Sequence, residues 1–100
     1  MPEPPPTLSD KSQAVWPYLE QRLRQSPSVW LALKDRMELG RQKYGTVLHS
    51  HNGRNALRDA KDEVEDLMYY VTQAHLEGKL ENYEAALGHA LTLWHMLDSP

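Results

Sequence analysis

The chain contains no cysteine, so it can form neither a disulfide nor a thiolate metal site. It has no apolar run long enough to be a membrane-spanning helix, and we expect no membrane association. The opening residues, MPEPPPTLSD, include neither a basic nor an apolar stretch, which argues against a secretory signal and favours a cytoplasmic location. Strong metal ligands are limited to carboxylates and five histidines, so a site for a hard cation must be built from oxygen atoms.

An excess of positive charge is also lacking. The net charge of −3 argues against a protein that coats nucleic acid, because such binding depends on neutralising phosphates with Lys and Arg. Six of the eleven basic residues nevertheless fall between positions 36 and 61, among several acids. They are Arg36, Arg41, Lys43, Arg54, Arg58 and Lys61. This mixture fits either a solvated surface, the interpretation that composition favours, or a site for metal and phosphate.

The pattern of apolar residues predicts an all-α fold in one domain. Residues 1–12 form a proline-rich arm that we expect to be flexible, and residues 13–100 form the domain. Helical spacing of apolar side chains predicts four helices, over about residues 15–25, 27–44, 54–76 and 80–97. No internal repeat or strand-like alternation is present. Short connections between amphipathic helices favour an up-and-down bundle, completed by oligomerisation because so short a chain can hardly cover every apolar face.

Turn and capping residues set the expected helix ends. Ser26 precedes Pro27, which predicts a capping hydroxyl followed by proline at the first helical position. Gly45 and Gly78 are expected to end the second and third helices. Between Gly45 and Asn55 the sequence GTVLHSHNGRN has no helical period and is expected to be a loop.

The acids of the third predicted helix fall into two groups on a helical wheel. Asp62 and Glu65 point away from the apolar stripe. Arg58 lies four residues before Asp62, and Lys61 lies four residues before Glu65. These spacings predict two ordinary surface ion pairs, and this group needs no functional explanation.

The second group lies along the border of the apolar stripe. Asp59, Glu63 and Asp66 have no Lys or Arg three or four residues away on their own helix. Three like charges on an edge expected to be half-buried oppose one another's ionisation. Compensation could come from basic groups on another helix, from protonation or from a bound metal, and oxygen ligands suit Mg²⁺ or Mn²⁺.

The second predicted helix carries a further pair of acids, Asp35 and Glu38, three residues apart. If this helix packs antiparallel to the third, one carboxylate pair from each helix would converge, as in metal sites between the helices of bundles. Each pair alone is a weak signal, because acids three residues apart are common on solvated helices. Their combination favours a metal site more strongly.

Two groups of residues at the loop could face phosphate. The stretch Asn52-Gly53-Arg54-Asn55 opens the third helix, where free backbone N–H groups can receive an anion. Arg41 and Lys43 close the second helix on the other side of the loop. Plain capping, with Asn52 or Gly53 starting the helix, explains the same residues equally well. His49 and His51 are two residues apart, which is more typical of an exposed polar turn than of a metal site.

The stretch RQKYGTVLHSHNGRNALRDAKDEVEDLMYYV resembles the MazG-like, phage-type branch of the all-α nucleoside triphosphate pyrophosphohydrolases. The resemblance covers about residues 35 to 71, roughly a third of the chain. The features that carry it, in order, are a tyrosine-glycine helix end, an NGR helix start and an E-x-x-D pair.

The resemblance implies Mg²⁺, with Mn²⁺ possible, held by E-x-x-E on one helix and E-x-x-D on the next. Glu63 and Asp66 match the second pair, and Glu38 matches the end of the first. Asp35 stands where a glutamate is expected, so the sequence departs from the family pattern there. Asn55 stands where similar sequences have aspartate, which implies hydrogen bonding in place of charge.

The implied reaction is metal-assisted hydrolysis of a (d)NTP to (d)NMP and pyrophosphate, with water attacking the α-phosphorus. The catalytic residues would be Glu38 and Glu63. The metal ligands would be Asp35, Glu38, Glu63 and Asp66. The substrate-binding residues would be Lys43, Arg54, Asn55 and Lys61. The resemblance also implies a homodimer or homotetramer acting on the nucleotide pool, in the host cytoplasm if a phage encodes it.

Several alternatives stay open at the level of sequence. A purine substrate of the dGTP type is compatible with the resemblance, but no residue establishes the base or the sugar. Asp35, Asp59 or Asp62 could complete the metal site. A different class of function is a non-catalytic helical module that senses nucleotides or binds a protein.

Overall fold

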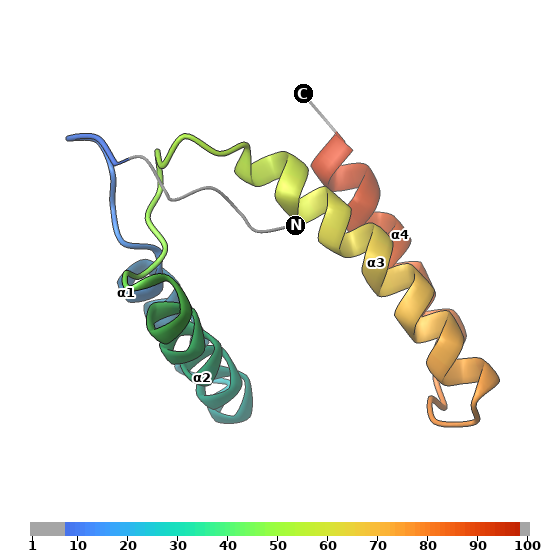
Figure 1. Ribbon diagram of the computed structural model, residues 1–100. Coiled ribbons are helices and arrows are strands. Elements are labelled where there is room, and N and C mark those ends of the chain that lie inside the picture. The colour runs from blue at the N-terminus through green and yellow to red at the C-terminus, as the bar shows by residue number, and fades with distance from the viewer. Residues whose placement is uncertain (1–7, 99–100) are drawn as a thin grey trace. The chain divides into compact units, whose positions relative to one another are not determined.

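The computed structural model describes residues 8–98, and residues 1–7 of the expected proline-rich arm lie outside this range. Its elements are α1 (Val15–Glu20), the 3₁₀-helix η1 (Gln21–Leu23), α2 (Pro27–Tyr44), α3 (Ala56–Leu76) and α4 (Tyr83–Asp98) (Figure 1). All regular elements of the described chain are helices, which confirms the all-α prediction. None of these helices is long and apolar enough to cross a membrane.

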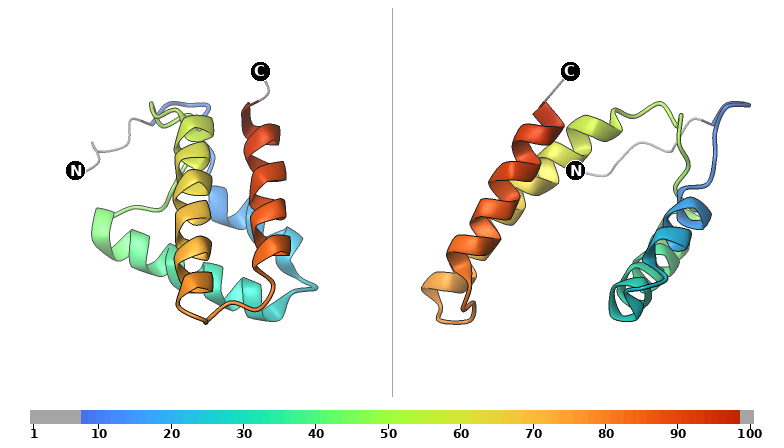
Figure 2. Two further views of the ribbon diagram at one scale, coloured as in Figure 1. Left: turned by 90° about the vertical axis from the view of Figure 1, so that its right-hand side faces the viewer. Right: turned by 180° about the vertical axis from the view of Figure 1, so that it is seen from behind.

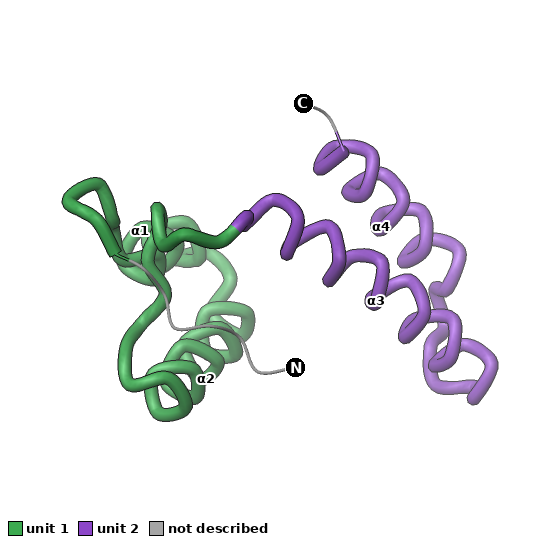
Figure 3. Tube along the Cα trace, turned by 45° about the horizontal axis from the view of Figure 1, so that its top comes forward, with its two compact units in different colours: residues 1–54 green, residues 55–100 purple. Residues whose placement is uncertain are grey.

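The chain divides into two compact units (Figure 3). Unit 1 covers residues 1–54 and holds α1, η1 and α2, whereas unit 2 covers residues 55–100 and holds α3 and α4. Each unit has its own packing and is described by itself. The assignment of residues 13–100 to one domain stays a prediction.

Unit 1 begins with a shorter helix than the sequence suggested. The prediction of a single helix over about residues 15–25 is wrong, because the α-helix ends at Glu20 and a 3₁₀ turn follows to Leu23. The cause lies in the next residues. Proline disfavours the helical region for the residue before it, and Ser26, before Pro27, has φ −133° and ψ 72°. The chain therefore tightens into a 3₁₀ turn, as is common at helix ends, and stops.

The start of α2 is set by proline rather than by a serine hydroxyl. Pro27 takes the first helical position, as expected, but the predicted cap is wrong because the Ser26 side chain makes no capping hydrogen bond. The Ser26 carbonyl instead accepts from the Trp30 amide at 2.9 Å. Gly45 ends the helix as predicted, with φ 75°, and its N–H donates to the Arg41 carbonyl at 2.8 Å.

Aromatic packing and backbone hydrogen bonds hold unit 1 together. The rings of Trp16 and Trp30 lie 6.4 Å apart between α1 and α2, and the Trp30 indole N–H donates to Glu20 at 3.2 Å. The segment after α2 runs back beside the residues before α1. An isolated antiparallel bridge joins Ala14 to His49 there, with the Val15 amide donating to the Leu48 carbonyl at 2.9 Å. This pairing holds segment 46–54 against the residues that precede α1.

Unit 2 is a pair of neighbouring helices, as Figures 1 and 2 show. The stop at Gly78 is confirmed, with φ 74° and its N–H donating to the His75 carbonyl at 3.0 Å. The last helix begins at Tyr83 and not at about Leu80 as predicted. The residues around Gly78 hydrogen-bond to the last turn of α3, so the chain reverses before it can start the next helix. Between α3 and α4, Val64 and Ala90 are buried.

Candidate functional site

The two acids expected on the second helix lie on α2, in unit 1. Asp35 is exposed and makes no hydrogen bond or ion pair within the described chain. Glu38 accepts from Arg41 Nη2 at 2.8 Å. Its side chain is 39% exposed, and ion pairs this accessible to water contribute little stability. A cation could therefore displace Arg41 at small cost.

The acids expected on the third helix lie on α3, in unit 2. Glu63 and Asp66 are three residues apart, and both are exposed. The expectation of a half-buried edge is wrong for these two, because both residues are exposed to water. Neither acid has a hydrogen bond or ion pair in residues 8–98, so both are available as ligands.

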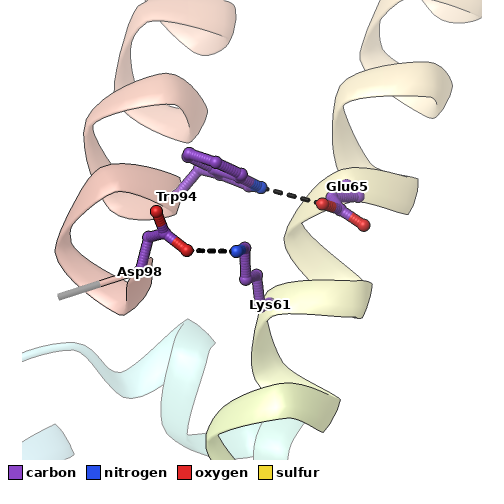
Figure 4. Close-up of polar contacts among 4 residues, drawn as sticks. All are labelled: Lys61, Glu65, Trp94 and Asp98. Atoms are coloured by element: carbon purple, nitrogen blue, oxygen red, sulfur yellow. Dashed lines mark hydrogen bonds and ion pairs between the residues drawn. The ribbon is translucent and has the colours of Figure 1, made fainter. Parts of the chain in front are cut away.

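Lys61 and Glu65 do not form the surface pair that their spacing suggested. The Lys61 ammonium forms an ion pair with Asp98 of α4 and lies 4.3 Å from the centre of the Trp94 ring. Glu65 accepts from the Trp94 indole N–H at 2.9 Å (Figure 4). The prediction was wrong because both side chains reach across to the neighbouring helix. We call Lys61, Glu65, Trp94 and Asp98 the α3–α4 clasp.

The groups assigned to phosphate have identifiable structural partners. Lys61 belongs to the clasp, and the Asn55 side chain accepts from the Arg58 amide at 3.0 Å, so Asn55 caps α3. The expected start at Asn52 or Gly53 is displaced to this residue. Lys43 is exposed, with its ammonium 5.2 Å from the centre of the Tyr44 ring. Arg54 is half-buried. Their role in binding substrate stays a prediction.

The loop histidines make local contacts. His49 Nδ1 lies 2.8 Å from the Val47 carbonyl, and His51 Nδ1 lies 3.0 Å from the Ser50 hydroxyl. Both distances are those of hydrogen bonds within the loop, as a polar turn would have. Over residues 8–98, no group of three or more histidines and acids is arranged to hold a metal ion. The four predicted ligands divide between the units, with Asp35 and Glu38 in one and Glu63 and Asp66 in the other.

Unit 1 also contains a cavity of about 370 Å³ that sequence reasoning missed. Residues of α1, one face of α2 and the segment 46–54 line it. Asn52, which is buried, belongs to this wall, and its side-chain oxygen accepts from the Arg54 amide at 3.1 Å. The available signal was the helical repeat of Leu33, Met37 and Tyr44, which predicts an apolar face but not a hollow beside it.

Comparison with protein-family models, with curated proteins and with solved structures finds no match to this chain. The resemblance to MazG-like hydrolases therefore depends on the residues quoted above.

Proposed function

We propose that this protein is a metal-dependent (d)NTP diphosphohydrolase that cleaves the bond between the α- and β-phosphates and releases (d)NMP and pyrophosphate. The observation that carries the proposal is the state of Glu63 and Asp66. Both are exposed and unpaired within the described residues, and both lie on a 21-residue helix at the spacing of the E-x-x-D pair. Exposed unpaired carboxylates contribute little to the packing of α3, and metal binding gives them a role.

The chemistry of the donor set fits Mg²⁺ or Mn²⁺. Asp35, Glu38, Glu63 and Asp66 offer only oxygen ligands, which hard divalent cations prefer. The bound cation would supply Lewis-acid chemistry at the phosphates. In the proposal, Glu38 and Glu63 also act as the catalytic carboxylates that orient the attacking water. Glu38 must release Arg41 to do so, because the two side chains are bonded at 2.8 Å.

In the proposal, the basic groups near the loop between α2 and α3 neutralise the negative charge of the triphosphate. Lys43 has an exposed ammonium, and Arg54 lies at the end of the loop before α3. Lys61 can join them only by leaving Asp98, whereas Asn55 can contribute a hydrogen bond from its amide nitrogen while its oxygen caps α3. The proposal places this activity in the cytoplasm, where it would act on the nucleotide pool.

A homodimer or homotetramer forms part of the proposal. Unit 2 is a helix pair that buries few apolar residues, and large side chains on it are exposed: Tyr69 at 79%, Leu76 at 79% and Met96 at 68%. Helix pairs of this size need further apolar surface to become stable. The exposed side chains support an assembly in which more protein covers them.

A screen for pyrophosphate release tests the proposal. The purified protein would be incubated with Mg²⁺ or Mn²⁺ and each common NTP and dNTP, and the products separated by chromatography. We expect monophosphate and pyrophosphate, with a large loss of rate in Glu63→Gln. The matched control is Glu81→Gln, which neutralises an exposed acid that has no partner among the described residues and lies outside the motif. A folded protein that releases no pyrophosphate from any of these nucleotides contradicts the proposal.

The exposed apolar side chains of unit 2 also favour a second candidate, a non-catalytic module that senses a nucleotide or binds a protein. The two candidates differ in what Glu63→Ala does. An interaction module keeps its affinity for its partner after this change, whereas the hydrolase loses turnover. Tight binding of a triphosphate without product formation would favour the sensor.

A further inference from the structure

The cavity in unit 1 is enclosed on three sides by different parts of the chain. Trp16 and Leu19 of α1 form one wall, and Val47 of the segment 46–54 forms another. The face of α2 that closes the cavity includes Met37 and Gly40. Most of this lining is apolar, and the volume of about 370 Å³ falls within the range of small-molecule sites in proteins.

The cavity lies on a different face of α2 from Asp35, whereas Glu38 is linked to the lining through Arg41, which donates to it at 2.8 Å. At about 100° per residue, Leu33, Met37 and Gly40 lie on one face of the helix. Asp35 lies on roughly the opposite face. A molecule held against the first face is separated from a cation at Asp35 by the width of the helix. A triphosphate whose metal ion is bound by Asp35 would therefore not lie in this cavity.

The charged residues of the lining have one sign. Arg36, Arg41 and Arg54 line the cavity, and no aspartate or glutamate does, although Arg41 is paired with Glu38 outside the lining. Arg36 has no ion pair within the described residues, although Asp35 is adjacent to it in sequence. An apolar hollow with Trp16 in its wall and an arginine at its edge favours a ligand that combines an aromatic body with a negative group.

Gly40 leaves the cavity wall open on the side of α2. It lies in the interior of α2 with no positive φ, so the backbone does not require glycine, and glycine weakens a helix relative to alanine. A Cβ built at this position meets nothing within 4 Å. Glycine therefore leaves open space in the cavity wall, which a larger side chain at this position would fill.

We propose that this cavity is a second ligand site, which binds a small planar aromatic anion with its ring beside Trp16 and its negative group at Arg36. The indole and Met37 supply the apolar contacts, and the guanidinium of Arg36 supplies charge-assisted hydrogen bonds to the anion. The inference does not depend on hydrolysis, since neither Glu63 nor a metal ion takes part.

Calorimetry on the full chain in EDTA tests the proposal without any contribution from metal. The probes are the nucleoside 5′-monophosphates and phenyl phosphate, with the uncharged nucleosides and inorganic phosphate as comparisons. We expect at least one aromatic phosphate to bind about tenfold or more tightly than its uncharged counterpart and than inorganic phosphate. Glu63→Gln should bind it as the unaltered protein does, which separates this result from the outcome of the hydrolysis screen.

Two substitutions place the binding in the cavity. Gly40→Leu fills the open space and should abolish binding, and Arg36→Gln should weaken it about five- to tenfold by removing a charged hydrogen bond. The matched controls are Gly88→Leu on α4, which also meets open space, and Arg24→Gln, an exposed arginine that does not line the cavity. Helical circular dichroism and molecular mass in solution are measured for each variant.

Three results would overturn the proposal. One is the absence of binding by every aromatic phosphate. Another is binding that Gly40→Leu and Arg36→Gln leave unchanged. The third is a change of oligomeric mass in Gly40→Leu with helical content intact, which would make the cavity a contact surface between copies of the chain. Gly40→Ala adds a smaller side chain than Gly40→Leu at the same position. It should keep the fold and retain part of the affinity for the ligand.

Discussion

The indole N–H of Trp94 on α4 donates to the carboxylate of Glu65 on α3 at 2.9 Å. The Lys61 ammonium lies 4.3 Å from the Trp94 ring centre and pairs with Asp98. These four side chains join the two helices near one end of the pair (Figure 4). These contacts add to the packing of the buried residues Val64 and Ala90 between the two helices.

Loss of the Glu65 carboxylate should therefore destabilise the α3–α4 pair. For Glu65→Ala we expect the free energy of unfolding to fall by about 1 kcal/mol, the typical net value of a protein hydrogen bond, because this one is exposed to water. Thermal and urea denaturation followed by circular dichroism measure this change. Asp62→Ala is the control, because Asp62 is an exposed acid on the same helix with no partner in residues 8–98. An equal loss in both variants would show that the clasp contributes nothing specific.

The cap of α3 is a second point where stability and function can be separated. Asn55→Ala removes the oxygen that accepts from the Arg58 amide, and should cost about 1 kcal/mol of stability. Asn55→Asp keeps that acceptor and adds negative charge at a helix N-terminus, so we expect stability at least equal to that of the unaltered protein. Denaturation measures both variants. If Asn55 acts only as a cap, turnover in Asn55→Asp is unchanged; a fall in its rate at full stability supports a contact with substrate.

Two glycines should respond to alanine in opposite directions. Gly40 lies inside α2 with ordinary helical backbone, so Gly40→Ala should stabilise the protein by about 0.5–1 kcal/mol. Gly78 has φ 74°, a conformation that alanine adopts with strain, so Gly78→Ala should destabilise it by about 1 kcal/mol. Neither new Cβ meets an atom within 4 Å, so packing does not confuse the comparison. Midpoints of denaturation that move the same way in both variants would contradict this account.

The Arg41–Glu38 ion pair should compete with the proposed metal. Arg41→Gln releases the Glu38 carboxylate from its 2.8 Å contact, and the concentration of Mg²⁺ that gives half-maximal turnover should fall. Exposed pairs contribute up to about 1 kcal/mol, so the expected change is up to about fivefold. Titration of Mg²⁺ against initial rate measures it, with Arg24→Gln as control. A half-maximal concentration that rises in Arg41→Gln would mean that Arg41 assists the site.

Local chemistry predicted the helix ends that depend on glycine. Gly45 and Gly78 end their helices because their positive φ is accessible to glycine at little cost, a property of the residue itself. The Ser26 cap was predicted wrongly because the serine backbone, constrained by Pro27, does not direct the hydroxyl to a helix amide. Residue type suggests a cap, but backbone geometry decides whether it forms.

Interactions between helices were harder to predict. Lys61 and Glu65 have the spacing of a pair on one helix, yet each binds a residue of α4 that is about 30 or more positions away in the chain. Helical periodicity assigns a side chain to a face and contains no information on which neighbour that face meets. The same limit applies to Asp35 and Glu38 relative to Glu63 and Asp66, because the two pairs belong to different units. The cavity of unit 1 was missed because it depends on how segment 46–54 returns beside α1.

The most direct test of the proposed hydrolysis follows the oxygen of the attacking water. The protein, Mg²⁺ and dGTP, or another common triphosphate, would be incubated in ¹⁸O-labelled water and the products analysed by mass spectrometry. The proposal predicts one ¹⁸O atom in the nucleoside monophosphate and none in the pyrophosphate, with label incorporation lost in Glu63→Gln. Label in the pyrophosphate, release of inorganic phosphate with a diphosphate, or no labelled product from any triphosphate would contradict it.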